Sequence, residues 1–236
     1  MKKGITKILS ACVFAFVVFL AAGTQSKAAV NMGVKQTGAG SSYVDLAWDA
    51  QLGAGHYHTQ FSQDGKNWID MDNSSSPSES VYNLTQGASY YARVVAYKGS
   101  HYTGTHVMIG VSETAIVSTK PTEVSGLTQT AAGVNSVSMS WNASAGAASY
   151  GIYGDINYNW TQIGTSATNS ATITGVAATT STRFSVAAVK NVTGGTVTGD
   201  QCSGVEMKAI PIKVSRIAMQ YYWDSLKEAK YIWTDV

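Results

Sequence analysis

A pair of aromatic residues recurs in this chain at a fixed spacing. Trp48 is followed nine residues later by Tyr57, and Trp141 is followed nine residues later by Tyr150, so the two pairs are offset by 93 residues. The register continues at an offset of 92 residues in three further matches: Trp68 with Trp160, Leu84 with Val176, and Lys98 with Lys190. A repeat of this kind indicates that one structural unit is present twice.

The repeat predicts two modules, residues 30–120 (module one) and 121–211 (module two). The boundary falls at Lys120-Pro121-Thr122, where a proline ends one edge strand and begins a linker. Each module has about 90 residues, which is near the size of a seven-stranded β-sandwich.

Short runs of alternating apolar and polar residues predict the strands. They include Tyr43 to Trp48, Val137 to Trp141 and Arg183 to Val189, and such alternation is typical of strands with one face toward a core. Asp64-Gly65 and Gly194-Gly195 predict tight hairpin turns, because both central residues of a primed turn need positive φ. Many short strands separated by turns favour an all-β sandwich or barrel.

Module one resembles a fibronectin type III domain. Trp48 stands at the position of that family's strand-B tryptophan, and residues 56–68 look like strands C and C′ with their turn. Residues 84–94 are similar to the family's L-x-x-G-x-x-Y-x-x-R-V segment, in which Tyr90 would form the tyrosine corner. The resemblance implies two tandem immunoglobulin-like β-sandwiches from a secreted, bacterial protein. It gives structural roles to Trp48, Tyr57, Tyr90, Trp141 and Tyr150.

Module two departs from the family pattern at two positions. Thr182 stands in the place of Tyr90, and Ser185 stands in the place of Arg93. Trp141 and Tyr150 remain, so we expect the same fold with lower stability.

The amino end predicts a secretory signal peptide over residues 1–28. Three early lysines precede an uncharged apolar run, Ile8 to Ala22, and Ser26 and Ala28 fit the cleavage site. The alternative is a retained anchor helix, but the run is shorter than the roughly 20 residues that a membrane span needs. We therefore expect a secreted, extracellular protein with no membrane span after signal removal.

Removal of residues 1–28 changes the net charge. Lys2, Lys3, Lys7 and Lys27 leave with the signal, so Lys+Arg falls from 16 to 12 against 14 Asp+Glu, and the charge changes from +2 to −2. A near-neutral chain lacks the basic patch that nucleic acid binding requires. Cys202 then remains alone, without a partner for an internal disulfide, and its residue type favours burial.

Two interpretations fit residues 212–236. The segment from Ser225 to Lys230 has residue types that favour a short helix. Alternatively, residues 211–217 align with 121–127, and Trp233 falls at the place of Trp141. On that second interpretation the chain ends in an incomplete third module.

The sequence contains no motif that indicates catalysis. G-x-S-x-G, H-E-x-x-H and metal-spaced Cys-His pairs are all missing, so we expect neither enzymatic activity nor a cofactor. We interpret the chain as an extracellular spacer or adhesion protein with an extracellular protein or polysaccharide as partner. Fibronectin type III modules of secreted bacterial proteins often accompany carbohydrate-active enzymes, and the resemblance therefore implies a carbohydrate-binding accessory module as an alternative.

Four histidines, all in module one, give a third hypothesis. His56 and His58 are two residues apart on a predicted strand and should share a face. The family resemblance places the loop with His101 and Tyr102 at the same end of the sandwich as His56, and His106 follows it. Imidazole is a common metal ligand, so these five residues form a candidate weak transition-metal or binding site. The alternative is a set of exposed histidines with no shared role.

Exposed aromatic residues are the last candidates. Tyr153, Tyr158 and Trp160 lie in the strand-C region of module two, and such rings can stack on sugars or anchor protein partners. Trp160 matches Trp68 across the repeat, which favours a structural role for that residue.

Overall fold

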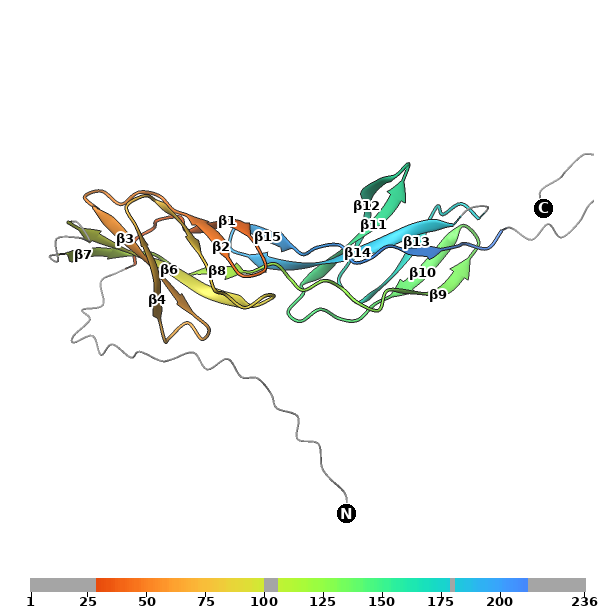
Figure 1. Cartoon of the computed structure of the whole chain (residues 1–236), viewed down its shortest axis with the longest axis horizontal. Coiled ribbons are helices and arrows are strands. Elements are labelled where there is room, and N and C mark those ends of the chain that lie inside the picture. The colour runs from red at the N-terminus through yellow and green to blue at the C-terminus, as the bar shows by residue number, and fades with distance from the viewer. Residues whose placement is uncertain (1–28, 100–105, 179–180, 212–236) are drawn as a thin grey trace, which may run out of the picture.

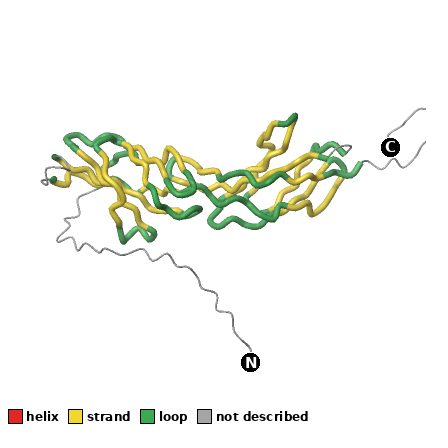
Figure 2. The backbone as a smooth tube through the Cα atoms, viewed as in Figure 1, coloured by secondary structure: helices red, strands yellow, loops and turns green. Residues whose placement is uncertain are grey.

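The computed structural model describes residues 29–99, 106–178 and 181–211, and every regular element in these ranges is a β-strand (Figures 1 and 2). The predicted signal peptide and the predicted tail, 212–236, lie outside the described residues. The described part of the chain contains no helix of the length and apolarity needed to cross a membrane.

The strands divide evenly between the two modules. Those of module one are β1 (Lys35–Ala39), β2 (Val44–Ala47), β3 (His56–Ser62), β4 (Ile69–Ser74), β5 (Ser78–Val81), β6 (Ser89–Lys98), β7 (Val107–Val111) and β8 (Ala115–Ser118). Those of module two are β9 (Thr128–Gly133), β10 (Ser136–Ser140), β11 (Ser149–Ile156), β12 (Asn159–Ser166), β13 (Ser170–Thr174), β14 (Thr182–Val192), β15 (Gly195–Thr198) and β16 (Val205–Met207).

Each module consists of two antiparallel sheets. In module one, a sheet with the order β1-β2-β5 faces a sheet with the order β4-β3-β6-β7, and β8 also pairs with β6. Module two repeats this arrangement as β9-β10-β13 and β12-β11-β14-β15, with β16 on β14. The predicted all-β fold of two tandem immunoglobulin-like sandwiches is confirmed.

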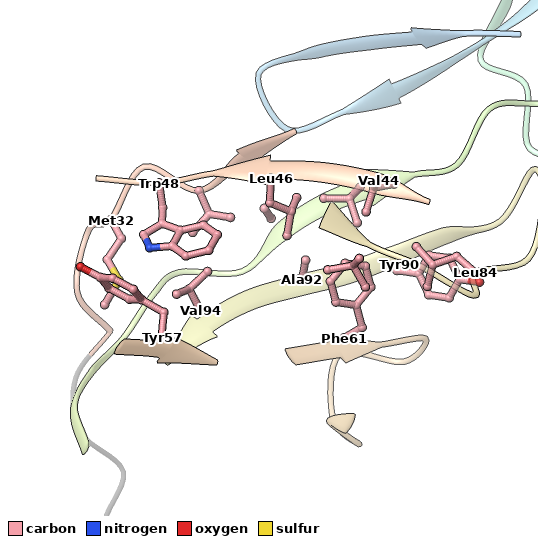
Figure 3. Packing of buried hydrophobic residues seen from close by; sticks show 14 of the residues in the cluster. Met32, Val44, Leu46, Trp48, Tyr57, Phe61, Leu84, Tyr90, Ala92 and Val94 are labelled. Atoms are coloured by element: carbon pink, nitrogen blue, oxygen red, sulfur yellow. The ribbon is translucent and has the colours of Figure 1, made fainter. Parts of the chain in front are cut away.

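The same aromatic pair lies in both cores. The rings of Trp48 and Tyr57 meet edge to face with centroids 5.4 Å apart, and those of Trp141 and Tyr150 do so at 5.3 Å (Figure 3 shows the first pair). All four side chains are buried. The repeat found in the sequence is therefore a repeat of core packing, since an edge-to-face pair of large rings fills the space between two sheets.

The tyrosine of each pair is also fixed through its hydroxyl group. The backbone N–H of Gln51 donates to the Tyr57 hydroxyl oxygen at 3.0 Å, and the N–H of Ser144 donates to that of Tyr150 at the same distance. Each bond ties the loop before the strand to the core, so a buried phenol keeps a hydrogen-bond partner.

Two of the predicted turns differ in detail from the structure. The expected primed turn at Asp64-Gly65 is wrong: only Gly65 has positive φ (71°), and residues 63–68 form a longer loop between β3 and β4. The Asp64 carboxylate accepts hydrogen bonds from the backbone N–H groups of Lys66 and Asn67, both at 2.8 Å, and this local capping favours the wider loop. The β14–β15 turn lies at Thr193-Gly194, one residue earlier than expected.

A turn with positive φ at both central residues does occur, but at a place that the sequence did not indicate. It joins β11 to β12 through Asn157 (φ 54°) and Tyr158 (φ 64°).

The remaining cysteine is inside module two. Cys202 is buried, as its residue type favours, and it forms no disulfide. Its Sγ atom accepts a hydrogen bond from the backbone N–H of Val186 at 3.3 Å. The side chain therefore behaves as a small core residue rather than as a reactive thiol.

Candidate functional site

Three of the four histidines gather around Tyr97 on the outer face of module one. His56 and His58 lie on β3, Tyr97 lies on β6, and His106 directly precedes β7. The centroid of the Tyr97 ring lies 5.1 Å from that of His56, 4.9 Å from that of His58 and 5.1 Å from that of His106. Tyr97 is thus the centre of the cluster, because the antiparallel register places it opposite His56.

The imidazoles are also close to one another. The ring of His56 lies 5.4 Å from that of His58 and 5.4 Å from that of His106, and the last two are 6.2 Å apart. His56 is buried and its ring is stacked on Tyr97 at 10°. Its Nδ1 atom lies 2.9 Å from the carbonyl oxygen of Gly99, and since a carbonyl only accepts, Nδ1 carries the proton.

Charged residues flank the cluster on the same sheet. Burial raises the pKa of the Tyr97 phenol, the Asp70 carboxylate raises it further, and Arg93 opposes them. Burial also lowers the pKa of Arg93, although Asp70 and Tyr97 counter that effect. Tyr97 therefore remains a neutral phenol that can donate a hydrogen bond, and Arg93 remains charged.

A hydrogen-bonded strip continues from the cluster toward β4. The Arg93 guanidinium lies 4.0 Å from the centroid of Trp68, and its Nε–H donates to Oε1 of Gln60 at 2.7 Å. The amide of Gln60 in turn donates to Oδ1 of Asp70 at 2.6 Å. These bonds hold the outer face of β3, β4 and β6 in one arrangement, against which the histidine cluster is positioned.

The predicted site residues divide into two groups. The structure brings His56, His58 and His106 together, whereas His101 and Tyr102 lie outside the described residues. Within the described ranges, no three His, Cys, Asp or Glu side chains are arranged to hold a metal ion. The metal-site hypothesis stays a prediction, and the described geometry fits stacking and hydrogen bonding by aromatic and imidazole rings.

The candidate aromatics of module two have a different setting. Tyr158 is 98% exposed and Trp160 is 40% exposed, both on the β11–β12 hairpin, while Tyr153 is half-buried. Arg183 lies 5.8 Å from the centroid of the Trp160 ring. A carbohydrate-binding face is expected to carry a row of coplanar rings on one sheet face. In this hairpin the two exposed rings occupy different settings, since Trp160 lies on β12 and Tyr158 lies in the turn.

One polar depression lies in the described surface of module one. It has a volume of 370 Å³ and lies beside β2 and β5, with Asp45 and Glu79 in its lining. Oδ1 of Asp45 accepts a hydrogen bond from the Ser80 hydroxyl at 2.6 Å. The carboxylate is thus committed to a strand-to-strand bond within the sheet.

Comparisons with known proteins gave structural matches only. No protein-family model and no curated protein matches this sequence. The FN1–FN3 domains of chicken CNTN1 match over 77% of this chain and 68% of their own, with 14% identity and a TM-score of 0.43. A two-domain fibronectin type III segment of chicken tenascin matches over 75% of this chain and 97% of its own, with 17% identity and a TM-score of 0.38.

The strand order within each module is that of the fold which the sequence resemblance implied. A three-stranded sheet faces a five-stranded sheet that begins with the C′-like strand, β4 or β12, and this arrangement occurs twice along the chain. The chain is built of two tandem immunoglobulin-like sandwiches that share one strand order.

Proposed function

We propose that this chain is a non-catalytic extracellular spacer, which holds two sandwich modules end to end and presents their surfaces for adhesion. The junction between the modules supports the proposal most directly. Domains that share only a short linker move relative to one another by default. A spacer of defined length therefore needs contacts between its modules in addition to the linker.

The first of these contacts joins a turn of module two to an edge of module one. The backbone N–H of Thr193, in the β14–β15 turn, donates to the carbonyl oxygen of Ile116 on β8 at 2.8 Å. The N–H of Ile116 donates in return to Oγ1 of Thr193 at 2.7 Å. The hairpin lies alongside module one (Figure 1), and this reciprocal pair satisfies both backbone groups of an edge residue.

Two lysines add charge-assisted contacts. The ammonium group of Lys190 on β14 donates to the backbone carbonyl of Gly87 in module one. Lys190 is buried, and burial lowers its pKa, so this carbonyl replaces part of its lost hydration. At the surface, Nζ of Lys120 lies 2.5 Å from Oδ1 of Asp200, which is an exposed ion pair of small energetic weight.

Distance measurements between spin labels test the proposal. Ser75 and Ala167 are exposed and occupy equivalent places in the two modules, each in the loop after the edge strand. Labelled cysteines at these positions should give one narrow distance distribution, while the buried Cys202 stays unlabelled. A broad distribution in the parent chain would contradict a spacer of fixed length.

The contact made by Lys190 provides the matched comparison. Lys190→Ala should broaden the distribution, because the Gly87 carbonyl loses its partner across the junction. Lys98 is the repeat equivalent of Lys190 but is exposed at the end of β6. Lys98→Ala should leave the distribution unchanged.

A further inference from the structure

The outermost strand of the larger sheet differs in charge between the two modules. In module one this strand is β4, which carries Asp70 and Asp72. In module two it is β12, whose eight residues, Asn159–Ser166, include no charged residue and no proline. Charged side chains and prolines are the usual means by which edge strands avoid pairing with other chains. β4 has the protection of charge and β12 lacks it, while an extra residue interrupts the pairing of both strands alike.

The outer side of β12 is open in the part of the chain that the structure describes. β12 pairs with β11, and within the described ranges no other strand pairs with it. A β-bulge interrupts the pairing of β12 at Ile163. Ile152 pairs with Gly164 and the next residue, Tyr153, pairs with Gln162, so Ile163 has no partner in β11. Residues 159–162 thus form a regular outer half beside the hairpin turn.

The register indicates which backbone groups point outward. Ile156 and Asn159 close the two-residue turn, so their backbone groups face each other across the hairpin. Backbone direction alternates along an antiparallel strand. The N–H and C=O groups of Trp160 and Gln162 therefore point away from β11, where a further strand would meet them.

The hairpin also carries exposed apolar side chains to its tip. Figure 1 shows the β11–β12 hairpin standing out from the side of module two. Ile156 is 48% exposed, Trp160 is 40% exposed and Tyr158 is almost fully exposed. Positive φ is unusual for a bulky residue such as Tyr158, and such local strain is found at binding surfaces more than elsewhere.

The equivalent hairpin of module one serves as an internal comparison. Its loop is closed by polar side chains, with Asp64 accepting the N–H groups of Lys66 and Asn67. Trp68 is covered by Arg93 at 4.0 Å, whereas Arg183 lies 5.8 Å from the ring of Trp160. The edge strand is therefore charged in module one and uncharged in module two, where the charged residue of the hairpin, Asp155, lies on β11 opposite Trp160.

We propose that β12 pairs in antiparallel fashion with β12 of a second copy of this chain. A two-fold interface brings the same patch together from both copies, so the strand must complement itself. An uncharged strand meets this condition because no like charges face each other. The outward hairpin lets two copies meet without contact between the bodies of their modules (Figure 1). The pairing would link spacers side by side, which goes beyond the spacing role.

Sedimentation velocity of the full chain over a concentration series tests the pairing. We expect a monomer–dimer equilibrium in which the dimer fraction grows with concentration. Gln162 is exposed and lies in the outer half of β12, so two-fold pairing places its two copies on neighbouring positions. Gln162→Glu and Gln162→Lys should each raise the dimer dissociation constant roughly threefold or more, through like-charge repulsion.

A mixture of the two variants gives the most specific result. Equimolar Gln162→Glu and Gln162→Lys chains should restore association, because opposite charges then face each other. Asn73→Glu, at an exposed position of the charged strand β4, is the matched control and should leave association unchanged. A monomer at every concentration, unaltered association of Gln162→Glu, or no recovery in the mixture would each overturn the proposal.

Hydrogen exchange separates loss of pairing from loss of folding. In the parent chain the amides of Trp160 and Gln162 should exchange more slowly at high concentration, while those of β4 should not change. In Gln162→Glu this concentration dependence should disappear, with the exchange of the buried strand β14 unchanged. Slower exchange confined to β4 would show that the wrong edge had been assigned.

Discussion

The hydroxyl oxygen of Tyr90 accepts a hydrogen bond from the backbone N–H of Thr85 at 3.0 Å. The bond joins the start of β6 to the chain that leads into it, while the ring packs in the core 5.8 Å from that of Phe61. Module two carries Thr182, a residue without a phenol, at the equivalent position. One corner of the sandwich is therefore fastened in module one by a contact that module two cannot make.

Replacement of Tyr90 by phenylalanine isolates this bond. Tyr90→Phe keeps the buried ring and leaves the Thr85 N–H without its acceptor, so the free energy of unfolding of module one should fall by about 1 kcal/mol. Urea denaturation measures the change. Tyr91→Phe, at the adjacent and more exposed position, is the control and should have little effect. Equal stability of Tyr90→Phe and the parent would show that water replaces the lost acceptor.

The core of module two offers a second test on a single strand. Ile152 on β11 is fully buried, and Ile152→Ala should lower the free energy of unfolding of module two by about 2–5 kcal/mol through lost packing and a cavity. Ile156, on the same strand, is half exposed, so Ile156→Ala should cost less than about 1 kcal/mol. Calorimetry should show the module-two transition moving while that of module one remains. Similar costs for both variants would contradict the assigned core.

The fold was predictable from the sequence because its signals are local and occur twice. Alternation of apolar and polar residues predicted β2, β10 and β14, and the equivalent positions of Trp48 and Trp141 indicated the repeat. The turns were less predictable, since their type depends on side-chain contacts. Asp64 caps its own loop and removes the need for a primed turn, whereas Asn157-Tyr158 adopts one without a glycine.

The candidate site was predictable only in part. The two-residue spacing placed His56 and His58 on one strand, but Tyr97 comes to lie beside both rings only through the pairing of β3 with β6. Such a register is set by the whole sheet and leaves no local signal. The contact of Trp160 was equally hard to predict from the repeat. The repeat equivalent of Arg93 is Ser185, yet the cation beside Trp160 is Arg183, two residues earlier on the same strand. Alternation puts positions 183 and 185 on one face.

The loop between β3 and β4 should make module one sensitive to acid. Hydrogen bonds from the Asn67 and Lys66 backbones, with others from Ser62 and the Asn67 side chain, hold the pKa of Asp64 well below its usual range. As pH falls below the ordinary aspartate value of about 3.9, the unfolded chain binds a proton before the folded one does. The stabilising contribution of Asp64 is therefore present above that value and declines toward the lower folded pKa.

A substitution of Asp64 tests whether its carboxylate makes module one lose stability as the pH falls. In Asp64→Asn, module one should lose stability less steeply between about pH 5 and pH 2 than in the parent, because one titrating group has gone. Denaturation with urea at several pH values measures the slope. Asp72→Asn, on the neighbouring strand and exposed, is the control and should keep the parent slope. An unaltered slope in Asp64→Asn would assign the acid sensitivity to other carboxylates.

Retention on extracellular polymers distinguishes adhesion from metal binding. The full chain should be retained by an insoluble polysaccharide or an extracellular matrix protein, and a chelator should not release it. The reason is that a spacer which presents the surfaces of its modules needs no metal ion for adhesion. His58→Ala should accordingly keep both the retention and its resistance to the chelator. Retention that a chelator abolishes and that His58→Ala lacks would instead favour the histidine cluster around Tyr97 as a metal-dependent binding site.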